Sequence, residues 1–326
     1  MQKILVTGAT GFIGSNLIIE LIKQGYQVRA FHRSTSNTAT LAEANVEHVI
    51  GDVRDKESLR KAIRECDTVF HTAALISFFK QKQKQHFEIN VEGTRNIVEV
   101  CLELDVEKLV HTSTIGALGF TTDGSLVDEN TIYNWGNGIA YRYTKHLAEL
   151  EVLKGMGKGL NASIVNPSVI IGPRDVNIHG GQLIRDIKNG KIPAYTDGGI
   201  NIVGVEDVVL GHISAAKFGK TGERYILGNV NLTHKELFHL IASLIDGKAP
   251  KIKAPKWFVQ TTVFFSGIIS NLSGIELPLS PTIAKSLLAY NWCSHEKATR
   301  ELGYKPKPIQ QAILEAYDWY KKNGML

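Results

Sequence analysis

The residues that decide the fold lie at the start of the chain, Lys3-Ile4-Leu5-Val6-Thr7-Gly8-Ala9-Thr10-Gly11-Phe12-Ile13-Gly14. The first five form an apolar, largely β-branched run that is typical of a buried parallel strand. The amphipathic residues after the glycines predict a helix through about Ile22 that ends near Gly25. A strand, a glycine turn and a helix in this order favour a dinucleotide site, because glycines let the backbone approach a pyrophosphate and the helix N-terminus offers N–H groups to its charge.

The glycines of this turn are spaced three-and-three, at Gly8, Gly11 and Gly14, whereas the usual dinucleotide pattern is two-and-three. Glycines also occur in such turns for their backbone geometry alone. Three of them at regular spacing, directly after a strand, favour a nucleotide site. We therefore expect six residues of the turn and helix start to bind the cofactor: Gly8, Thr10, Gly11, Phe12, Ile13 and Gly14.

Predicted strands and helices alternate after this turn as far as Asn166. This alternation is typical of an α/β fold with a doubly wound parallel sheet, the Rossmann architecture, which binds ligands at the carboxyl ends of its strands. Beyond Asn166 the simple alternation ends. We expect a dinucleotide-binding domain formed by residues 1–166 and about 200–228, and a smaller, mostly α substrate domain formed by 167–199 and 229–326.

The residues after the second predicted strand, Gln27–Phe31, are His32-Arg33-Ser34. An acidic residue in this region would bind the ribose hydroxyls and favour NAD. Arg33 and Ser34 instead suit a 2′-phosphate, because a guanidinium offers several donors to phosphate oxygens, and Arg29 is close in the sequence. The sequence thus predicts NADP(H) as the preferred cofactor, and NAD(H) stays open if Arg33 is only a surface residue.

The predicted strands Glu47–Ile50 and Thr68–His71 each end near residues that suit a nucleotide. The aspartate after the first strand can accept a hydrogen bond from the adenine amino group, or it caps the next helix. The two alanines after the second strand leave room for a ribose or nicotinamide near the backbone. The predicted cofactor contacts in this part are Asp52, Val53, Ala73 and Ala74.

Tyr141 and Lys145 lie four residues apart in a predicted helix, so both side chains share one face. A phenol is a poor base at neutral pH because its pKa is near 10. The lysine cation, together with a nicotinamide ring, would stabilise the phenolate. A hydroxyl from Thr112-Ser113-Thr114, which follows the predicted strand Lys108–His111, could hold the substrate oxygen while Tyr141 moves its proton.

Composition indicates a soluble globular protein. Of the 326 residues 43% are hydrophobic and 21% are charged, and the net charge of +5 is spread along the chain. The three cysteines lack metal-ligand or disulfide spacing, which fits a reducing cytoplasm, and no signal peptide precedes the first strand. No pattern indicates nucleic-acid binding.

The apolar stretch Trp257–Ile269 is too short to span a bilayer and suits a substrate-domain helix or a helix at a membrane surface.

Over nearly its whole length the chain resembles the extended short-chain dehydrogenase/reductase superfamily, also called the NAD-dependent epimerase/dehydratase family. The motifs that carry this resemblance are Thr7–Gly14, Gly51–Val53, Asn90-Val91-Glu92-Gly93-Thr94, Tyr141 with Lys145, Asn166-Pro167 and Arg300–Tyr304. A closer resemblance is to the branch of dihydroflavonol 4-reductases and hopanoid-associated sugar epimerase homologues. It is carried by Asn166-Pro167-Ser168, Gly172–Asp175, Val205–Val208 and Glu223–Gly228.

The resemblance implies roles for individual residues. It assigns catalysis to Thr114, Tyr141 and Lys145, with Ser113 as a neighbour that could replace Thr114. Sugar 4,6-dehydratases have an Asp-Glu pair after the catalytic threonine, where this chain has Ile115-Gly116, which argues against a dehydratase. Members of the reductase branch generally use NADPH, and homodimers are common in the superfamily.

The resemblance also implies contacts beyond the catalytic residues. Asn166 would face the substrate, and Pro167 and Val169 would pack near the nicotinamide. Together with Thr114 and Arg174, Asn166 completes the predicted substrate contacts.

Three functions agree with these features. The first is an NADP(H)-dependent reductase or dehydrogenase that transfers a hydride to or from a carbonyl or secondary alcohol of a small substrate. The second is an NAD-dependent epimerase of a nucleotide-linked sugar, in which Arg174 and Arg185 would bind the diphosphate and against which Arg33 argues. The third is a non-catalytic dinucleotide-binding sensor, against which the intact catalytic side chains argue.

Overall fold

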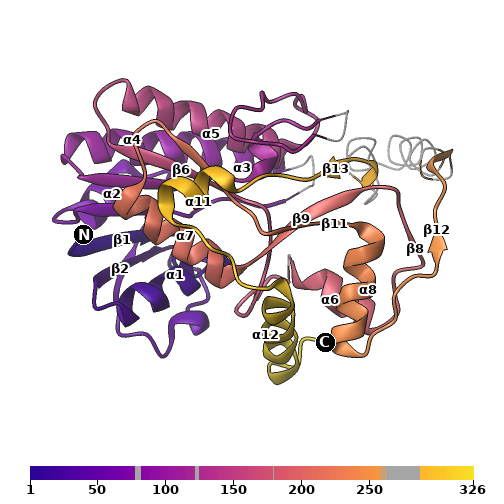
Figure 1. Cartoon of the computed structure of the whole chain (residues 1–326). Coiled ribbons are helices and arrows are strands. Elements are labelled where there is room, and N and C mark those ends of the chain that lie inside the picture. The colour runs from indigo at the N-terminus through magenta and orange to yellow at the C-terminus, as the bar shows by residue number, and fades with distance from the viewer. Residues whose placement is uncertain (78–81, 122–124, 179, 258, 260, 262–286) are drawn as a thin grey trace.

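The computed structural model describes residues 1–77, 82–121, 125–178, 180–257, 259, 261 and 287–326. A large sheet with helices on both faces lies beside a smaller region of short strands and helices (Figure 1). Most of the stretch 257–269, for which the sequence suggests a helix, lies outside the described residues.

The large sheet has seven strands, and every neighbouring pair is parallel. In spatial order they are β10 (Arg224–Leu227), β6 (Ala162–Pro167), β5 (Lys108–Thr112), β4 (Thr68–His71), β1 (Lys3–Thr7), β2 (Gln27–His32) and β3 (Glu47–Ile50). The chain order reverses between β1 and β4, and doubly wound folds bind ligands at the carboxyl ends of the strands at such a point. The predicted fold class is confirmed.

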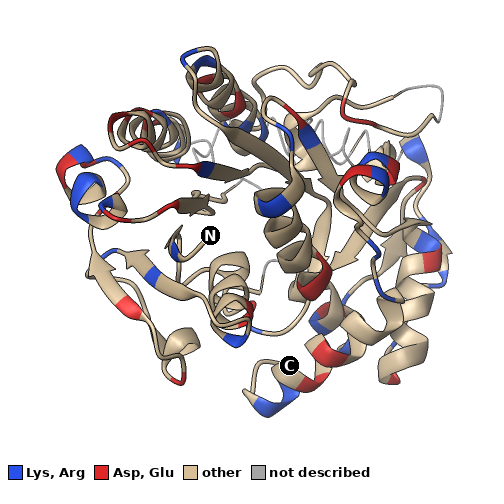
Figure 2. Cartoon of the chain, turned by 60° about the vertical axis from the view of Figure 1, so that its left-hand side comes forward, with Lys and Arg blue, Asp and Glu red and all other residues tan. Residues whose placement is uncertain are grey.

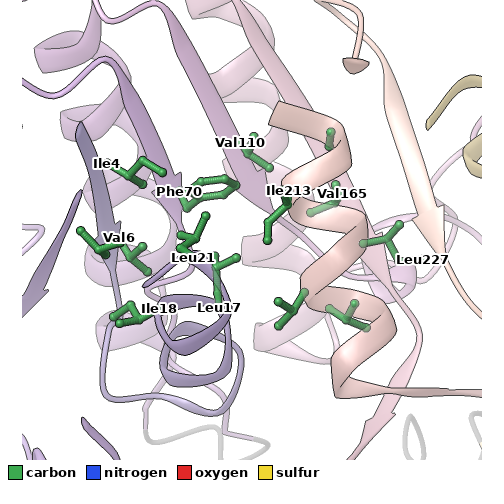
Figure 3. Packing of buried hydrophobic residues seen from close by; sticks show 14 of the residues in the cluster. Ile4, Val6, Leu17, Ile18, Leu21, Phe70, Val110, Val165, Ile213 and Leu227 are labelled. Carbon is green, nitrogen blue, oxygen red and sulfur yellow. The ribbon is translucent and has the colours of Figure 1, made fainter. Parts of the chain in front are cut away.

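Alternate residues of the strands build a core on each face of this sheet. Ile4 and Val6 of β1 face one core with α1 and α7, which Figure 3 shows, and Leu5 faces the other core with α2, α4 and α5. These flanking helices are α1 (Phe12–Lys23), α2 (Lys56–Ile63), α4 (Gly93–Glu103), α5 (Ala140–Met156) and α7 (Val205–Phe218). Short 3₁₀ turns lie at η1 (Ala39–Leu41) and η4 (Ile115–Ala117). Burial on both faces explains why the strands read as continuous apolar runs.

The helical segment between β4 and β5 contains a π-helical turn. It comprises α3 (Gln83–His86), the π turn η3 (Phe87–Glu92) and α4. Asn90 in the π turn accepts a hydrogen bond from the Leu75 N–H (2.7 Å) and donates to the Leu75 carbonyl (3.1 Å). The turn thus fixes the segment that follows β4, and such turns occur often at functional sites.

The smaller region contains more strand than the mostly α domain that the sequence predicts. Its strands are β7 (Val169–Ile171), β9 (Gly199–Gly204), β11 (Val230–Thr233) and β13 (Tyr290–Asn291), with β8 (Ala194–Tyr195) pairing β12 (Ile252–Lys253) separately. Its helices are α6 (Gly181–Lys188), α8 (His234–Ile245) and α12 (Ile309–Lys322). They enclose a third core around Ile184, Ile241 and Ile313.

The structure divides the chain differently from the prediction at two places. Residues 200–204 lie in β9, which pairs with β7 just after the chain has left the large sheet, so only the part from α7 to β10 returns to that sheet. The helix α11 (Glu296–Leu302) belongs to the large part, because Ala298 and Leu302 are buried in the same core as α1 and α7.

Within the described part of the chain, no helix is long and apolar enough to cross a membrane, and no group of His, Cys, Asp or Glu side chains could hold a metal ion. Lys and Arg are interspersed with Asp and Glu over the elements in view in Figure 2. Cys66, Cys101 and Cys293 are buried thiols, and they behave as small apolar core residues.

Candidate active site

The turn between β1 and α1 packs so closely against its surroundings that two positions require glycine. Gly8 has φ +65°, and a Cβ there would lie 2.7 Å from Ala73 Cα. A Cβ on Gly14 would collide with the Gly8 carbonyl oxygen. Helix α1 begins at Phe12, and no side chain of the described residues caps it at Gly11. The first N–H groups of α1 therefore fit an anionic pyrophosphate at the carboxyl edge of the sheet.

Of the two arginines that the sequence places near the 2′-phosphate, Arg33 is exposed after β2 and Arg29 is buried. The Arg29 guanidinium donates to the carbonyls of Ala62 (2.6 Å) and Arg64 (3.1 Å) at the end of α2. It also pairs with Glu47 at 2.9 Å. Arg29 therefore holds β2, α2 and β3 together, and Arg33 remains the candidate for phosphate binding.

The Asp52 carboxylate is bound to Arg54. It accepts hydrogen bonds from Arg54 N (2.9 Å), Nε (3.0 Å) and Nη2 (2.8 Å), which hold the pKa of Asp52 below its usual value although burial opposes this. Asp55, and not Asp52, caps α2. Val53 is buried, and its carbonyl accepts from Asn96 Nδ2 at 3.0 Å. An adenine amino group would thus share the Asp52 carboxylate with Arg54.

The segment after β4 is held beside the glycine turn. The Ala73 N–H donates to Thr7 Oγ1 (3.3 Å), and the Thr72 hydroxyl donates to the Thr7 carbonyl (2.7 Å). The contact of Asn90 with Leu75 fixes the next residues of the segment. These hydrogen bonds hold the half-buried Ala73 and Ala74 at the carboxyl edge of the sheet, where the sequence predicts that they contact the cofactor.

Lys145 is buried on α5 and reaches the end of β5. Its Nζ donates to the Thr112 carbonyl at 2.6 Å and lies 3.3 Å from His111 Nε2. Burial lowers the pKa of Lys145 to about 8, against the opposing effect of Glu149. Burial also holds the pKa of His111 well below its ordinary value, so this histidine is neutral at pH 7. Because an ammonium group can only donate, His111 Nε2 accepts a hydrogen bond from Lys145 Nζ.

Tyr141 shares a face of α5 with Lys145, and its hydroxyl is hydrogen-bonded to Thr114. Burial raises the pKa of Tyr141 to about 12, and the Thr114 hydrogen bond and the charge of Arg142 act in the opposite direction. The sequence predicts that Lys145 lowers this pKa. In the structure burial outweighs the Thr114 hydrogen bond and the charge of Arg142, so Tyr141 carries its proton at neutral pH.

Thr114, and not Ser113, occupies the position beside Tyr141. Thr114 follows β5 in an extended conformation, and its Oγ1 accepts a hydrogen bond from the Gly116 N–H at 3.2 Å. Ser113 is buried, and its N–H donates to the Val165 carbonyl at 2.7 Å. Successive side chains of an extended segment point to opposite sides. Because Ser113 points into the interior, Thr114 points to the side of Tyr141.

Asn166, at the end of β6, is buried among residues of the site. Its Nδ2 donates to the Thr114 carbonyl (3.0 Å) and to Glu149 Oε1 (2.7 Å). Pro167 is buried beside Leu227 of β10, whereas Val169 at the start of β7 is exposed. The Asn166 amide nitrogen thus bonds within the protein, and the contact of Asn166 with a substrate, which the family resemblance implies, stays a prediction.

Arg174 lies beside the first turns of α1. It has a left-handed backbone conformation (φ +70°), and its Nη1 donates to Asn16 Oδ1 at 3.3 Å. Asn16 in turn donates to the Pro173 carbonyl at 3.1 Å. Arg185, on α6, donates to Gln182. The two arginines predicted to bind a sugar diphosphate are therefore held by different elements, and Arg174 contacts α1.

Arg142 is a residue of the site that the sequence pattern does not indicate. Its Cζ lies 4.0 Å from the ring centroid of Trp135, and its stem packs over Gly116. Burial lowers the pKa of Arg142 to about 10. This contact ties the loop before α5 to the turn after Thr114. The loop has neither hydrophobic periodicity nor a motif, so the sequence carries no signal for the contact.

Comparisons with known proteins agree with this geometry. The sequence profile of the 3-beta hydroxysteroid dehydrogenase/isomerase family matches residues 5–230. A Synechocystis protein, provisionally named dihydroflavonol 4-reductase, is 33% identical over 325 residues, which are 98% of this chain and 94% of that protein. Sterol demethylase protein B of Methylococcus capsulatus is 31% identical over 334 residues, and the match covers 99% of each chain.

A solved structure supports the same conclusion. The crystal structure of gox2253 has a TM-score of 0.91 and 36% identity, and the match covers 100% of both chains. The profile match and the identities over nearly the full length exceed what a shared fold alone would give. The chain belongs to the 3-beta hydroxysteroid dehydrogenase/isomerase family of the extended short-chain dehydrogenases/reductases, and it is an NAD(P)-dependent enzyme of that type.

Proposed function

We propose that this chain is an NADP(H)-dependent reductase or dehydrogenase that acts on a carbonyl or secondary alcohol of a small substrate. The observation that carries this proposal is the hydrogen bond between Thr114 and Tyr141, beside Lys145, at the sheet edge that also holds the glycine turn. The names of the family and of the reductase relative agree with a hydroxyl or ketone substrate.

Each residue of the site has a separate role in the proposed reaction. Bound NADP(H) would supply or accept the hydride, held by the N-terminus of α1 and by Arg33. Tyr141 gives its proton to the substrate oxygen during reduction and takes it back during oxidation. Thr114 Oγ1 accepts from the Gly116 N–H, and its own O–H can still donate to Tyr141 or to the substrate oxygen. Lys145, as a cation, stabilises the phenolate that remains after proton transfer.

Turnover tests the proposed function. The protein is mixed with NADPH and a dihydroflavonol or a 3-oxosteroid, and the nicotinamide absorbance is followed together with the alcohol product. Oxidation of NADPH in equal amount to the alcohol formed is the expected result. Protein that copurifies with NAD and interconverts UDP-sugars without net redox change would instead be an epimerase.

Arg33→Ala tests the cofactor preference. Loss of charge-assisted hydrogen bonds to the 2′-phosphate is expected to weaken NADPH binding about 10- to 100-fold and to leave NADH binding nearly unchanged. Nicotinamide fluorescence titrations with both cofactors measure this. Arg60→Ala, an exposed arginine on α2 that pairs with Glu103, is the matched control. Equal weakening for NADPH and NADH, or none, would contradict a phosphate role for Arg33.

Lys145→Met tests the buried cation through stability. Folded Lys145 titrates near pH 8 and the unfolded side chain near 10.5, so the unfolded state binds more protons between these values. The wild-type free energy of unfolding therefore rises with pH there relative to the variant, by about 3 kcal/mol in all. Urea denaturation of both proteins from pH 7.5 upward measures the difference. A difference that stays flat or falls over this window would show that Lys145 is not a desolvated cation.

A further inference from the structure

Glu149 is a buried carboxylate one helical turn beyond Lys145. Tyr141, Lys145 and Glu149 follow one another at intervals of four residues on α5, so they share one helix face. Glu149 has no exposed surface. A carboxylate in the interior is costly unless hydrogen bonds or a cation compensate for the lost water. Its contacts therefore indicate why the position is acidic.

Two partners hold the two oxygens of Glu149. Oε1 accepts from Asn166 Nδ2 at 2.7 Å, and Oε2 lies 3.0 Å from Arg224 Nε in an ion pair. Asn166 has no exposed surface either, and the same Nδ2 donates to the Thr114 carbonyl at 3.0 Å. Because an amide nitrogen carries two protons, it can fill both acceptors at once. A continuous chain of contacts thus runs from Arg224 through Glu149 and Asn166 to Thr114.

The end of this chain is the backbone that presents the catalytic hydroxyl. The Thr114 carbonyl also accepts from the Ala117 N–H at 3.0 Å, and Thr114 Oγ1 accepts from the Gly116 N–H at 3.2 Å. Asn166 therefore fixes the Thr114 peptide from the β6 side, and the 3₁₀ turn fixes it from the other. A displacement of reacting groups by about 1 Å can cost about 100-fold in rate.

We propose that Glu149 is a positioning residue: through the Asn166 amide it holds the Thr114 backbone where the Thr114 hydroxyl reaches Tyr141 and the substrate oxygen. Its role in turnover rests on the proposed function, whereas its role in holding Thr114 does not. A carboxylate suits this role because a charged acceptor binds an amide N–H more strongly than a neutral one. A glutamate kept only for its ion pair would act through Arg224 alone, and this difference can be tested.

The test compares variants that cut the chain of contacts at different points. Glu149→Ala removes both contacts and Asn166→Ala removes the link to Thr114. Arg224→Met removes the ion pair and leaves the Asn166 bond, so it is the matched control. Glu149→Gln keeps the size of the side chain and one acceptor oxygen. This variant replaces Glu149→Ala in the test if the alanine variant does not fold.

Amide hydrogen exchange, measured without substrate or cofactor, reports whether Thr114 still accepts its two backbone hydrogen bonds. The N–H groups of Gly116 and Ala117 are expected to exchange about tenfold faster in Glu149→Ala and Asn166→Ala than in the wild type, and near the wild-type rate in Arg224→Met. Glu149→Gln is expected to fall between. Unchanged exchange in both alanine variants, or equal acceleration in Arg224→Met, would overturn the proposal.

Kinetics then separate positioning from general loss of stability. With a substrate found by the turnover assay, Glu149→Ala is expected to lower kcat about 10- to 100-fold with KM for NADPH nearly unchanged, and Glu149→Gln to recover part of kcat. Arg224→Met is expected to lose stability without a comparable loss of kcat. If kcat falls in proportion to lost stability in every variant, Glu149 is only an ion-pair residue. If the wild type turns over no ketone, the proposed function fails, and the exchange measurement still decides the role of Glu149.

Discussion

Tyr141→Phe is expected to lower kcat by about 10²- to 10⁴-fold, the contribution of a positioned proton donor or acceptor. In the proposed function the phenol oxygen exchanges a proton with the substrate oxygen, and phenylalanine keeps the ring while removing that oxygen. Because burial raises the pKa of Tyr141 to about 12, the wild-type side chain is protonated at neutral pH and ready to act in the direction of reduction. NADPH binding, measured by fluorescence titration, should change little.

Tyr143→Phe is the matched control for this variant. Tyr143 lies on the same helix, and its ring is 6.4 Å from that of Tyr133. Removal of its hydroxyl is expected to leave kcat nearly unchanged. A Tyr141→Phe enzyme that retains most of its turnover would show that the proton comes from another group. Full biological function in that variant would favour the dinucleotide-binding sensor.

The large sheet could be predicted from the sequence because local pattern and tertiary structure agree there. Strands buried on both faces must be apolar throughout, and the glycine turn marks where the first of them ends. The smaller sheet and the separate β8–β12 pair could not be predicted. The strands β13 and β12 have two residues each, and their pairing with distant strands leaves no local pattern. The strand β9 likewise joins β7 through a contact that its own sequence does not specify.

The candidate site shows the same division. Tyr141 and Lys145 could be predicted from their fixed helical spacing, and the hydroxyl run Thr112–Thr114 from its place at a strand end. The choice of Thr114 within that run rests on the family resemblance. Glu149 has the helical spacing too, but a glutamate on a charged helix is usually solvated, and only the structure shows that it is buried against Asn166. The role of Arg142 depends on a loop contact. Tertiary burial, which the sequence does not encode locally, decides both.

Gly14→Ala is expected to destabilise the protein by about 3 kcal/mol or more, because an added Cβ would overlap the backbone of Gly8. Helix propensity alone predicts that Gly14→Ala is more stable than the wild type. Gly14 lies inside α1, where alanine is favoured over glycine by about 1 kcal/mol. The two arguments therefore give opposite signs, and the urea midpoint decides between them. The close approach should dominate, since the obstructing atoms are backbone and cannot rotate away.

Gly11→Ala is the control within the same turn. A Cβ at Gly11 would lie 3.1 Å from the Gly8 carbonyl oxygen, a distance that a small backbone shift can relieve. We expect this variant to fold with a loss of about 1 kcal/mol, mostly from the weaker N-cap. NADPH binding should weaken in both variants, because both positions lie in the turn that we propose binds the pyrophosphate. A Gly14→Ala protein as stable as the wild type would mean that the turn can open, and the glycine spacing would then reflect cofactor approach more than packing.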